Sequence, residues 1–232
     1  MNFTKTMQAL EDMGTAQNRK VYARHGVGAQ MFGVSVANLK TLKKQIKTDH
    51  PLAQQLWDSG NHDARNLATM IADPKLADET LLETWAQDLD NYVITDAFVG
   101  FVIQTSLAQA KATTWIESNQ EYIARAGWHL LGQIAMKDTS LPDSFFNPYL
   151  QTIQGEIHQK PNRTREGMNN ALIAIGIRNP VLMDKALYVA ETIGEVQVDH
   201  GETNCKTNFA PEYIARTVAR KKSRGQWIEP GD

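Results

Sequence analysis

The sequence has few of the features that mark secreted and membrane-bound proteins. Its single cysteine, Cys205, cannot form an internal disulfide, so nothing points to secretion. No stretch approaches the roughly 20 apolar residues that a membrane span needs, and no apolar run follows a basic start at the N-terminus. We therefore expect a cytoplasmic, monomeric protein with no signal peptide and no membrane partner.

Motifs for several common chemistries are also missing. The chain has no P-loop, no glycine-rich dinucleotide fingerprint and no paired-cysteine motif, and its six histidines lack metal-ligand spacing. We therefore expect no metal and no cofactor. Cys205 lies near His200 in VDHGETNCKT, and a Cys–His nucleophile is conceivable there. A buried structural cysteine is the usual state of a lone cysteine and is the interpretation we favour.

Length and composition indicate an ordinary globular protein. The chain has 232 residues, of which 42% are hydrophobic and 22% charged, which is enough to bury a large core without disulfides or metals. We predict a single domain over residues 1–232, with residues 223–232 as a candidate flexible tail.

Charge is distributed unevenly along a chain whose net charge is only −2. Residues 1–50 carry eight Lys/Arg against three Asp/Glu, whereas residues 51–110 carry two against nine. Such a chain can present a basic face while staying nearly neutral overall, and a basic face suits phosphate binding. The basic stretch includes Lys40, Lys43, Lys44 and Lys47. A solvated helix surface explains these four lysines equally well, so both alternatives stay open.

Helical periodicity predicts an all-α fold. Ser35 is a good N-cap for a helix with apolar residues three or four positions apart and lysines on the opposite face. Ser118 and Glu121 form a capping box for a later helix. Further helices are predicted to begin near Pro51, Asn61, Asn91, Asn179 and Pro211. About a dozen short helices result, with almost no period-two alternation.

Two segments resemble one another and indicate a repeat. LWDSGNHDARNLATMIA begins at Leu56, and TWIESNQEYIARAGWHLLGQIA begins at Thr114. Each has a tryptophan, a polar turn, an Ala-Arg pair and an apolar helix, so Arg65 and Arg125 occupy equivalent places. Helix pairs repeated along a chain are typical of an α-solenoid.

The segment NYVITDAFVGFVIQTS carries an aspartate within an apolar helix. With Asn91 as N-cap, Tyr92 lies in the first turn and Asp96 lies four residues later on the same face. Because an unpaired buried charge is costly, Asp96 needs solvent, a partner or a site. An ion pair, for example with Arg125, is the structural alternative, and an anionic group beside an aromatic ring on a concave surface is the functional one.

Several segments together resemble the DNA alkylation repair family of AlkD-like proteins, from about Phe32 to Pro211. The segments are the stretch from Phe32 to Pro74, DNYVITDAF, ARAGWHLL, MNNALIAIGIRNP and VDHGETNCKT. The resemblance implies an α-solenoid of HEAT-like antiparallel helix pairs that forms a curved superhelix with a concave face.

The resemblance also implies an activity. Active members hold double-stranded DNA on a basic concave surface and cleave the N-glycosidic bond of a cationic alkylated purine. By order and spacing their aspartate corresponds to Asp96, which would stabilise an oxocarbenium-like transition state. An arginine at the position of Arg125 would hold phosphate through its planar fork.

Two aromatic positions of the active members differ in this chain. Tyr92 stands where they carry a tryptophan, and a second tryptophan falls at Asn170. Tyrosine can partly replace an indole that packs on a cationic centre, whereas asparagine cannot. Trp128 could supply another aromatic, although a place in the core is favoured. Three further residues are either phosphate contacts or ordinary loop charges: Arg163, Arg165 and Lys206.

Three functions are consistent with these residues. The first is a DNA repair N-glycosylase, a hydrolase that excises purines of the 3-methyladenine or 7-methylguanine type, and Asp96 with Arg125 favours it. The second is a catalytically altered nucleic-acid-binding HEAT-like module, favoured by Tyr92 and Asn170. The third is a protein-interaction solenoid, against which the basic N-terminal stretch counts. We lean to the first.

Overall fold

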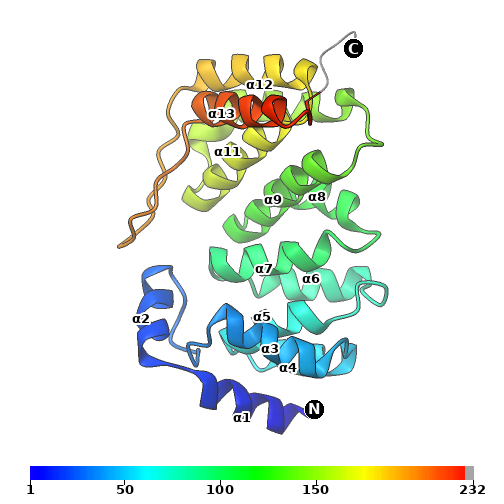
Figure 1. Ribbon diagram of the computed structural model, residues 1–232, viewed down its shortest axis with the longest axis vertical. Helices are drawn as coiled ribbons and strands as arrows, with labels where there is room; N and C mark the ends of the chain where they lie inside the picture. Colours follow the sequence, from blue (N-terminus) through cyan, green and yellow to red (C-terminus); the bar gives the residue numbers. More distant parts are fainter. Residues whose placement is uncertain (228–232) are drawn as a thin grey trace. The chain divides into compact units, whose positions relative to one another are not determined.

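The computed structural model describes residues 1–227, and within them the protein is built from helices and loops (Figure 1). The prediction of an all-α fold is confirmed, because the only β-type pairing in residues 1–227 is an isolated bridge between Gly14 and Val34. None of the described helices is long and apolar enough to cross a membrane.

Two compact units make up the chain. The first comprises Met1–Ala108 together with His200–Asn204, and the second comprises Gln109–Asp199 and the described residues from Cys205 onward. The single domain over residues 1–232 stays a prediction. Helices of the first unit are α1 (Phe3–Met13), α2 (Ala16–Arg24), α3 (Val36–Ile46), α4 (His50–Asp58), α5 (His62–Ile71), α6 (Glu79–Gln87) and α7 (Tyr92–Val102). Helix α8 (Ala108–Ile116) leads into the second unit, followed by α9 (Glu121–Lys137), η1 (Asp143–Phe146), α10 (Asn147–Glu156), η2 (Ile157–Gln159), α11 (Asn162–Gly176), α12 (Pro180–Ile193) and α13 (Ala210–Ser223).

The predicted N-caps mostly form as expected. Ser35 Oγ accepts a hydrogen bond from the backbone N–H of Asn38, and Asn91 Oδ1 accepts two from the first turn of α7. Asn179 caps α12 in the same way. These bonds satisfy backbone donors that a helix leaves unpaired at its start.

The capping box predicted at Ser118 does not form. Helix α9 begins at Glu121 with Gln120 as its N-cap, which makes no side-chain capping bond. Ser118 Oγ accepts a bond from the N–H of Gln120 at 3.1 Å. A serine hydroxyl that closes a local turn is no longer available as a helix cap.

The core of the first unit is aromatic. Trp57 of α4 stacks on Trp85 of α6 with ring centroids 4.2 Å apart and an interplanar angle of 3°. Phe98 and Phe101 of α7 pack beside this pair. Large aromatic side chains bury much apolar area, so this cluster fixes α4, α6 and α7 to one another.

A buried carboxylate anchors the segment between α2 and α3. Asp63 of α5 is 1% exposed, and its oxygens accept backbone N–H bonds from Phe32, Gly33 and Val34 at 2.7, 2.9 and 2.8 Å. Gly33 has a φ of +81°, a conformation that L side chains rarely adopt. Asp63 therefore holds the chain that leads into α3.

In the second unit, helices α8 and α9 approach closely at Gly127. A Cβ atom at that position would lie 2.4 Å from the backbone N of Ile116, so only glycine allows this approach. Gly127 lies two residues after Arg125 in α9, and Leu67 lies two residues after Arg65 in α5. Each arginine lies in the second helix of its predicted pair.

The end of the described chain packs against α13. Trp227 is buried, and Lys221 Nζ lies 5.8 Å from the centroid of its ring. The Lys221 ammonium donates to the carbonyl of Ile177, and burial lowers the pKa of Lys221. The predicted flexible tail thus includes a buried tryptophan, while its last residues, 228–232, lie outside the described residues.

Candidate functional site

A long cationic segment lies in the first unit. Residues 13–48 contain seven Lys/Arg and no Asp/Glu, and they include α2 and α3. The seven cations are Arg19, Lys20, Arg24, Lys40, Lys43, Lys44 and Lys47. We call residues 13–48 the cationic segment. It contains most of the positive charge that the sequence analysis found in residues 1–50.

The four lysines of the cationic segment on and after α3 face solvent. Lys40, Lys43, Lys44 and Lys47 are all exposed, and within residues 1–227 none makes a side-chain hydrogen bond or ion pair. Leu39 and Leu42, which lie about one turn apart, are buried on the other side of the helix. The lysine charges therefore have no acidic partner in the part of the chain that the structure describes.

Helix α2 is held at the surface mainly by polar contacts, since none of its residues is buried. Tyr22 Oη donates to the carbonyl of Val34 at 2.6 Å, and Arg19 Nη1 donates to the carbonyl of Phe32 at 3.1 Å. Burial and the nearby Asp63 charge raise the pKa of Tyr22. Lys20 and the other exposed residues of this helix are therefore presented by a short, solvated helix.

An open cleft of about 510 Å³ lies beside α2, lined in part by Lys20, Arg24 and Glu202. Two cations face one carboxylate there, so the cleft keeps a net positive charge.

Tyr92 and Asp96 lie on the same side of α7, as predicted, and both are half-buried. The hydroxyl of Tyr92 is hydrogen-bonded to Nδ1 of His25, and the two rings meet edge to face at 5.8 Å. Sequence reasoning missed this contact because the two residues are far apart in the chain. A carboxylate thus lies one helical turn from a phenol that is tied to the end of α2.

Two of the predicted arginines come together in the second unit. Arg125, 4% exposed, donates from Nη1 to Glu166 Oε2 at 2.6 Å, and Arg163 Nη1 donates to the same oxygen at 3.0 Å. The backbone N–H of Arg163 also donates to Glu121. Two guanidinium groups thus share the Glu166 carboxylate, and the Glu121 carboxylate lies beside them.

The other predicted residues of the second unit are more scattered. Arg165 is half-buried in α11, with its Nε buried and lacking a hydrogen-bond partner in the described residues. Asn170 is exposed on the same helix, and Lys206 is exposed in the segment before α13. Their contacts with DNA stay predictions, as does that of Arg125.

The predicted burial of Cys205 is wrong, whereas the predicted core position of Trp128 is confirmed. Cys205 is exposed rather than buried, because it lies in the extended segment between α12 and α13. Trp128 is a core residue, 1% exposed, with an edge contact to Tyr149 at 6.2 Å.

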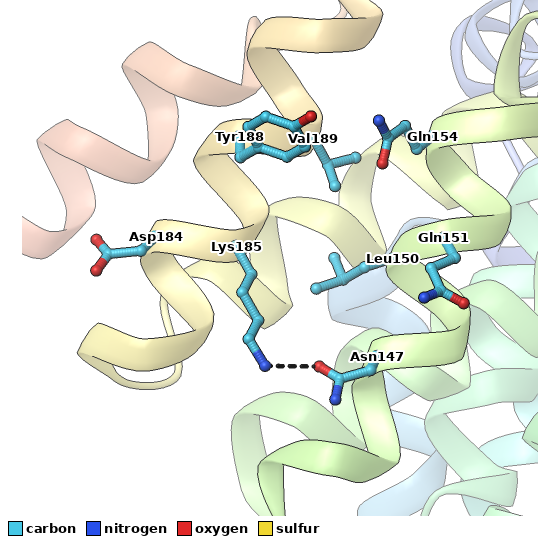
Figure 2. Close-up of a pocket in the computed structure, with 8 residues that line it drawn as sticks. All are labelled: Asn147, Leu150, Gln151, Gln154, Asp184, Lys185, Tyr188 and Val189. Atoms are coloured by element: carbon cyan, nitrogen blue, oxygen red, sulfur yellow. Dashed lines mark hydrogen bonds between the residues drawn. The ribbon is translucent and has the colours of Figure 1, made fainter.

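Two hollows in the structure were not predicted from the sequence. Figure 2 shows a groove of about 560 Å³ between α10 and α12, where Lys185 Nζ donates to Asn147 Oδ1 at 3.0 Å. Leu150 and Val189 give this groove an apolar lining, and Tyr188 is exposed beside them. One lysine and one aspartate line it, so it has no excess of positive charge for phosphate.

The second hollow is smaller and more polar, with a volume of about 130 Å³ in the first unit. We call it the α5–α7 pocket, because the starts of these helices line it. Its lining residues are Val27, Gly28, Gln30, Gly60, His62, Arg65, Asp90, Asn91 and Ile94. No motif marks it, since the residues come from three separate stretches of sequence.

The electrostatics of the α5–α7 pocket centre on His62. Burial lowers the pKa of this histidine, against the opposing charges of Asp63 and Asp90, so the imidazole is neutral at pH 7. Arg65, whose charge also lowers this pKa, is paired with Asp88 at 3.1 Å. Among the residues that the structure describes, no cluster of three or more His, Cys, Asp or Glu could hold a metal ion.

Comparison with known proteins decides the family. A sequence model described as "DNA alkylation repair enzyme" matches residues 5–214. This chain belongs to that family. The DNA alkylation repair resemblance of the sequence is thereby confirmed.

Relatives of this DNA alkylation repair family member are similar over nearly their whole length. An uncharacterized protein of Listeria monocytogenes is 29% identical over 228 residues, covering 93% of this chain and 96% of its own. An uncharacterized protein of Listeria innocua is 28% identical over 226 residues, covering 92% and 95%.

One solved structure is similar to this chain with a TM-score of 0.86 and 29% identity, over 99% of this chain and 98% of its own. It is described as "a new family of proteins related to the HEAT-like repeat DNA glycosylases with affinity for branched DNA structures". The predicted HEAT-like helical fold is confirmed by this match.

Proposed function

We propose that this protein binds branched DNA through the cationic segment. The observation that carries the proposal is the set of exposed lysines on and after α3 with no acidic partner in the described residues. The similar solved structure, with its described affinity for branched DNA, supports the same partner.

The physical argument rests on phosphate density. Each lysine or arginine that contacts a phosphate releases condensed counterions, which favours binding. At a branch point several duplex arms meet, so phosphates are denser there than along one duplex. Phosphate contacts carry no sequence information, and a surface of lysines therefore suits recognition of DNA shape.

A competition experiment tests this proposal. Binding of a labelled four-way junction is measured against an unlabelled junction and against an unlabelled linear duplex of the same arm sequence. We expect the junction to compete at least about tenfold better per molecule, with an affinity that falls steeply with salt. Equal competition by the linear duplex would contradict a preference for branches, and absence of binding to either would contradict the function.

Excision of a cationic alkylated purine is the second candidate, favoured by the position of Asp96 one turn after Tyr92 on α7. An alkylated purine is already positively charged and leaves readily. Departure of the base leaves an oxocarbenium-like sugar, whose charge a fixed carboxylate stabilises. In this candidate Asp96 supplies that carboxylate.

Single-turnover excision of 7-methylguanine from a labelled duplex tests the second candidate. Asp96→Asn should lower the excision rate by about 10²-fold, because the amide keeps the shape but not the charge. Duplex affinity, measured in parallel, should stay within about twofold. An unchanged rate in Asp96→Asn would rule out this role, and no excision by the wild type would leave binding alone as the function.

A further inference from the structure

We propose that the α5–α7 pocket binds the base of an unstacked guanine nucleotide. The inference rests on the proposed function, because a DNA branch point is where nucleotides most easily leave the base stack. Extrusion of a base is costly in a regular duplex and costs least where pairing is already lost.

His62 provides a hydrogen-bond donor. Asn66 Nδ2 donates to the carbonyl oxygen of His62 and lies 3.1 Å from His62 Nε2, so Nε2 acts as an acceptor. The neutral imidazole therefore carries its proton on Nδ1. His62 is 6% exposed, lines the pocket, and makes no hydrogen bond through Nδ1 within the described residues.

Acceptors line the same pocket. Asp90 is exposed, and one of its carboxylate oxygens accepts from Asn91 Nδ2 at 2.7 Å. Gln30 donates through Nε2 to the carbonyl of Ser59, which leaves its Oε1 as an acceptor. Arg65 donates to the side chain and the carbonyl of Asp88 and to the carbonyl of Trp57, and its charge is paired with Asp88. Besides this paired arginine, the pocket offers the His62 donor, two acceptors and the negative charge of Asp90.

Guanine matches this set of groups better than the other bases do. Its O6 can accept from His62 Nδ1–H, while its N1–H and N2 amino group can donate to the Asp90 carboxylate. Adenine and cytosine present an acceptor ring nitrogen where guanine presents N1–H, and a carboxylate repels it. Thymine has a single donor between two carbonyls, which gives the carboxylate only one bond.

The size of the pocket agrees with a base edge. Its volume is about 130 Å³, and a cavity of about 150 Å³ can hold a benzene ring. The pocket is slightly smaller than that, so it admits the O6/N1/N2 edge of the base while the rest of the nucleotide stays outside. Val27 and Ile94 supply apolar contact for the faces of the ring.

The contact between Tyr92 and His25 supports the wall of the pocket. His25 directly precedes the loop that carries Val27 and Gly28, and its ring is tied to the start of α7 by Tyr92. In this arrangement the tyrosine at position 92 positions the loop rather than touching the base.

The first test uses the full-length protein and three-way junctions that differ only in one unpaired nucleotide at the branch. Binding is measured by fluorescence anisotropy with unpaired guanine, adenine or hypoxanthine, which lacks the N2 amino group. We expect guanine to bind about tenfold tighter than adenine, with hypoxanthine between them. Asp90→Asn should remove the preference, whereas the matched control Asp58→Asn, also exposed in the first unit, should keep it.

Equal affinity for all three junctions, or an Asp90→Asn variant that still prefers guanine, would overturn the inference while leaving branch binding intact.

A second test needs no junction. Titration of 2′-deoxyguanosine into ¹⁵N-labelled protein should shift the His62 imidazole and Asn91 amide signals saturably in the wild type and not in Asp90→Asn. Absence of a saturable shift would overturn the inference even if every junction were bound, and its presence would uphold the pocket even if none were.

Discussion

Replacing the four lysines on and after α3 by glutamine together should weaken junction binding by about 10³-fold at 0.1 M salt. Each phosphate contact contributes roughly 0.9 to the slope of log K against log salt. Loss of four contacts should therefore lower that slope by about three to four. The lysines are exposed and without acidic partners in the described residues, so glutamine removes charge without breaking a contact.

A graded set of variants makes this result decisive. Lys40→Gln with Lys44→Gln should lose about half of the effect on the slope. The matched control replaces Lys75 and Lys137, which are exposed outside the cationic segment, and should change the slope little. Unfolding free energies should stay within about 0.5 kcal/mol of the wild type. A quadruple variant with the wild-type slope would show that these lysines are only a solvated surface.

Asp63→Ala should lower the free energy of unfolding by about 4 kcal/mol. The carboxylate accepts from three backbone N–H groups and is 1% exposed, so alanine leaves three donors without their acceptor. An unsatisfied buried donor costs about 1–3 kcal/mol, and local relaxation recovers part of that sum. Urea unfolding, followed by tryptophan fluorescence, measures the change.

Asp63→Asn separates charge from shape in this experiment. Its amide oxygen can still accept, so we expect a loss of about half that of alanine. Asp58→Ala, at an exposed site on the neighbouring helix, should be close to neutral. A loss below about 1 kcal/mol in Asp63→Ala would mean that water replaces the carboxylate, and that the anchor before α3 is dispensable.

Local features of the fold could be predicted from the sequence because they depend on neighbouring residues. Ser35 and Asn91 cap helices through atoms two or three residues away, and such short-range bonds are visible in the sequence. Ser118 shows the limit, since the same hydroxyl could cap a helix or close a turn. The outcome depended on where Glu121 and the rest of α9 packed.

The candidate site was only partly predictable. Tyr92 and Asp96 could be placed on one face of a helix because their spacing fixes that relation. The partner of Tyr92, His25, is 67 residues away, and no periodic pattern links them. Cys205 was misjudged because burial depends on the packing around a segment and not on the residue type alone.

The peptide group between Phe32 and Gly33 has a consequence for how the cations are shared. Its carbonyl accepts from Arg19 and its N–H donates to Asp63, so one peptide plane lies between a guanidinium and a carboxylate. Hydrogen bonds in such a chain polarise one another, so the buried carboxylate strengthens the hold of the backbone on Arg19. One cation of the cationic segment is thereby fixed in position, whereas the four lysines on and after α3 have no side-chain bond within the described residues.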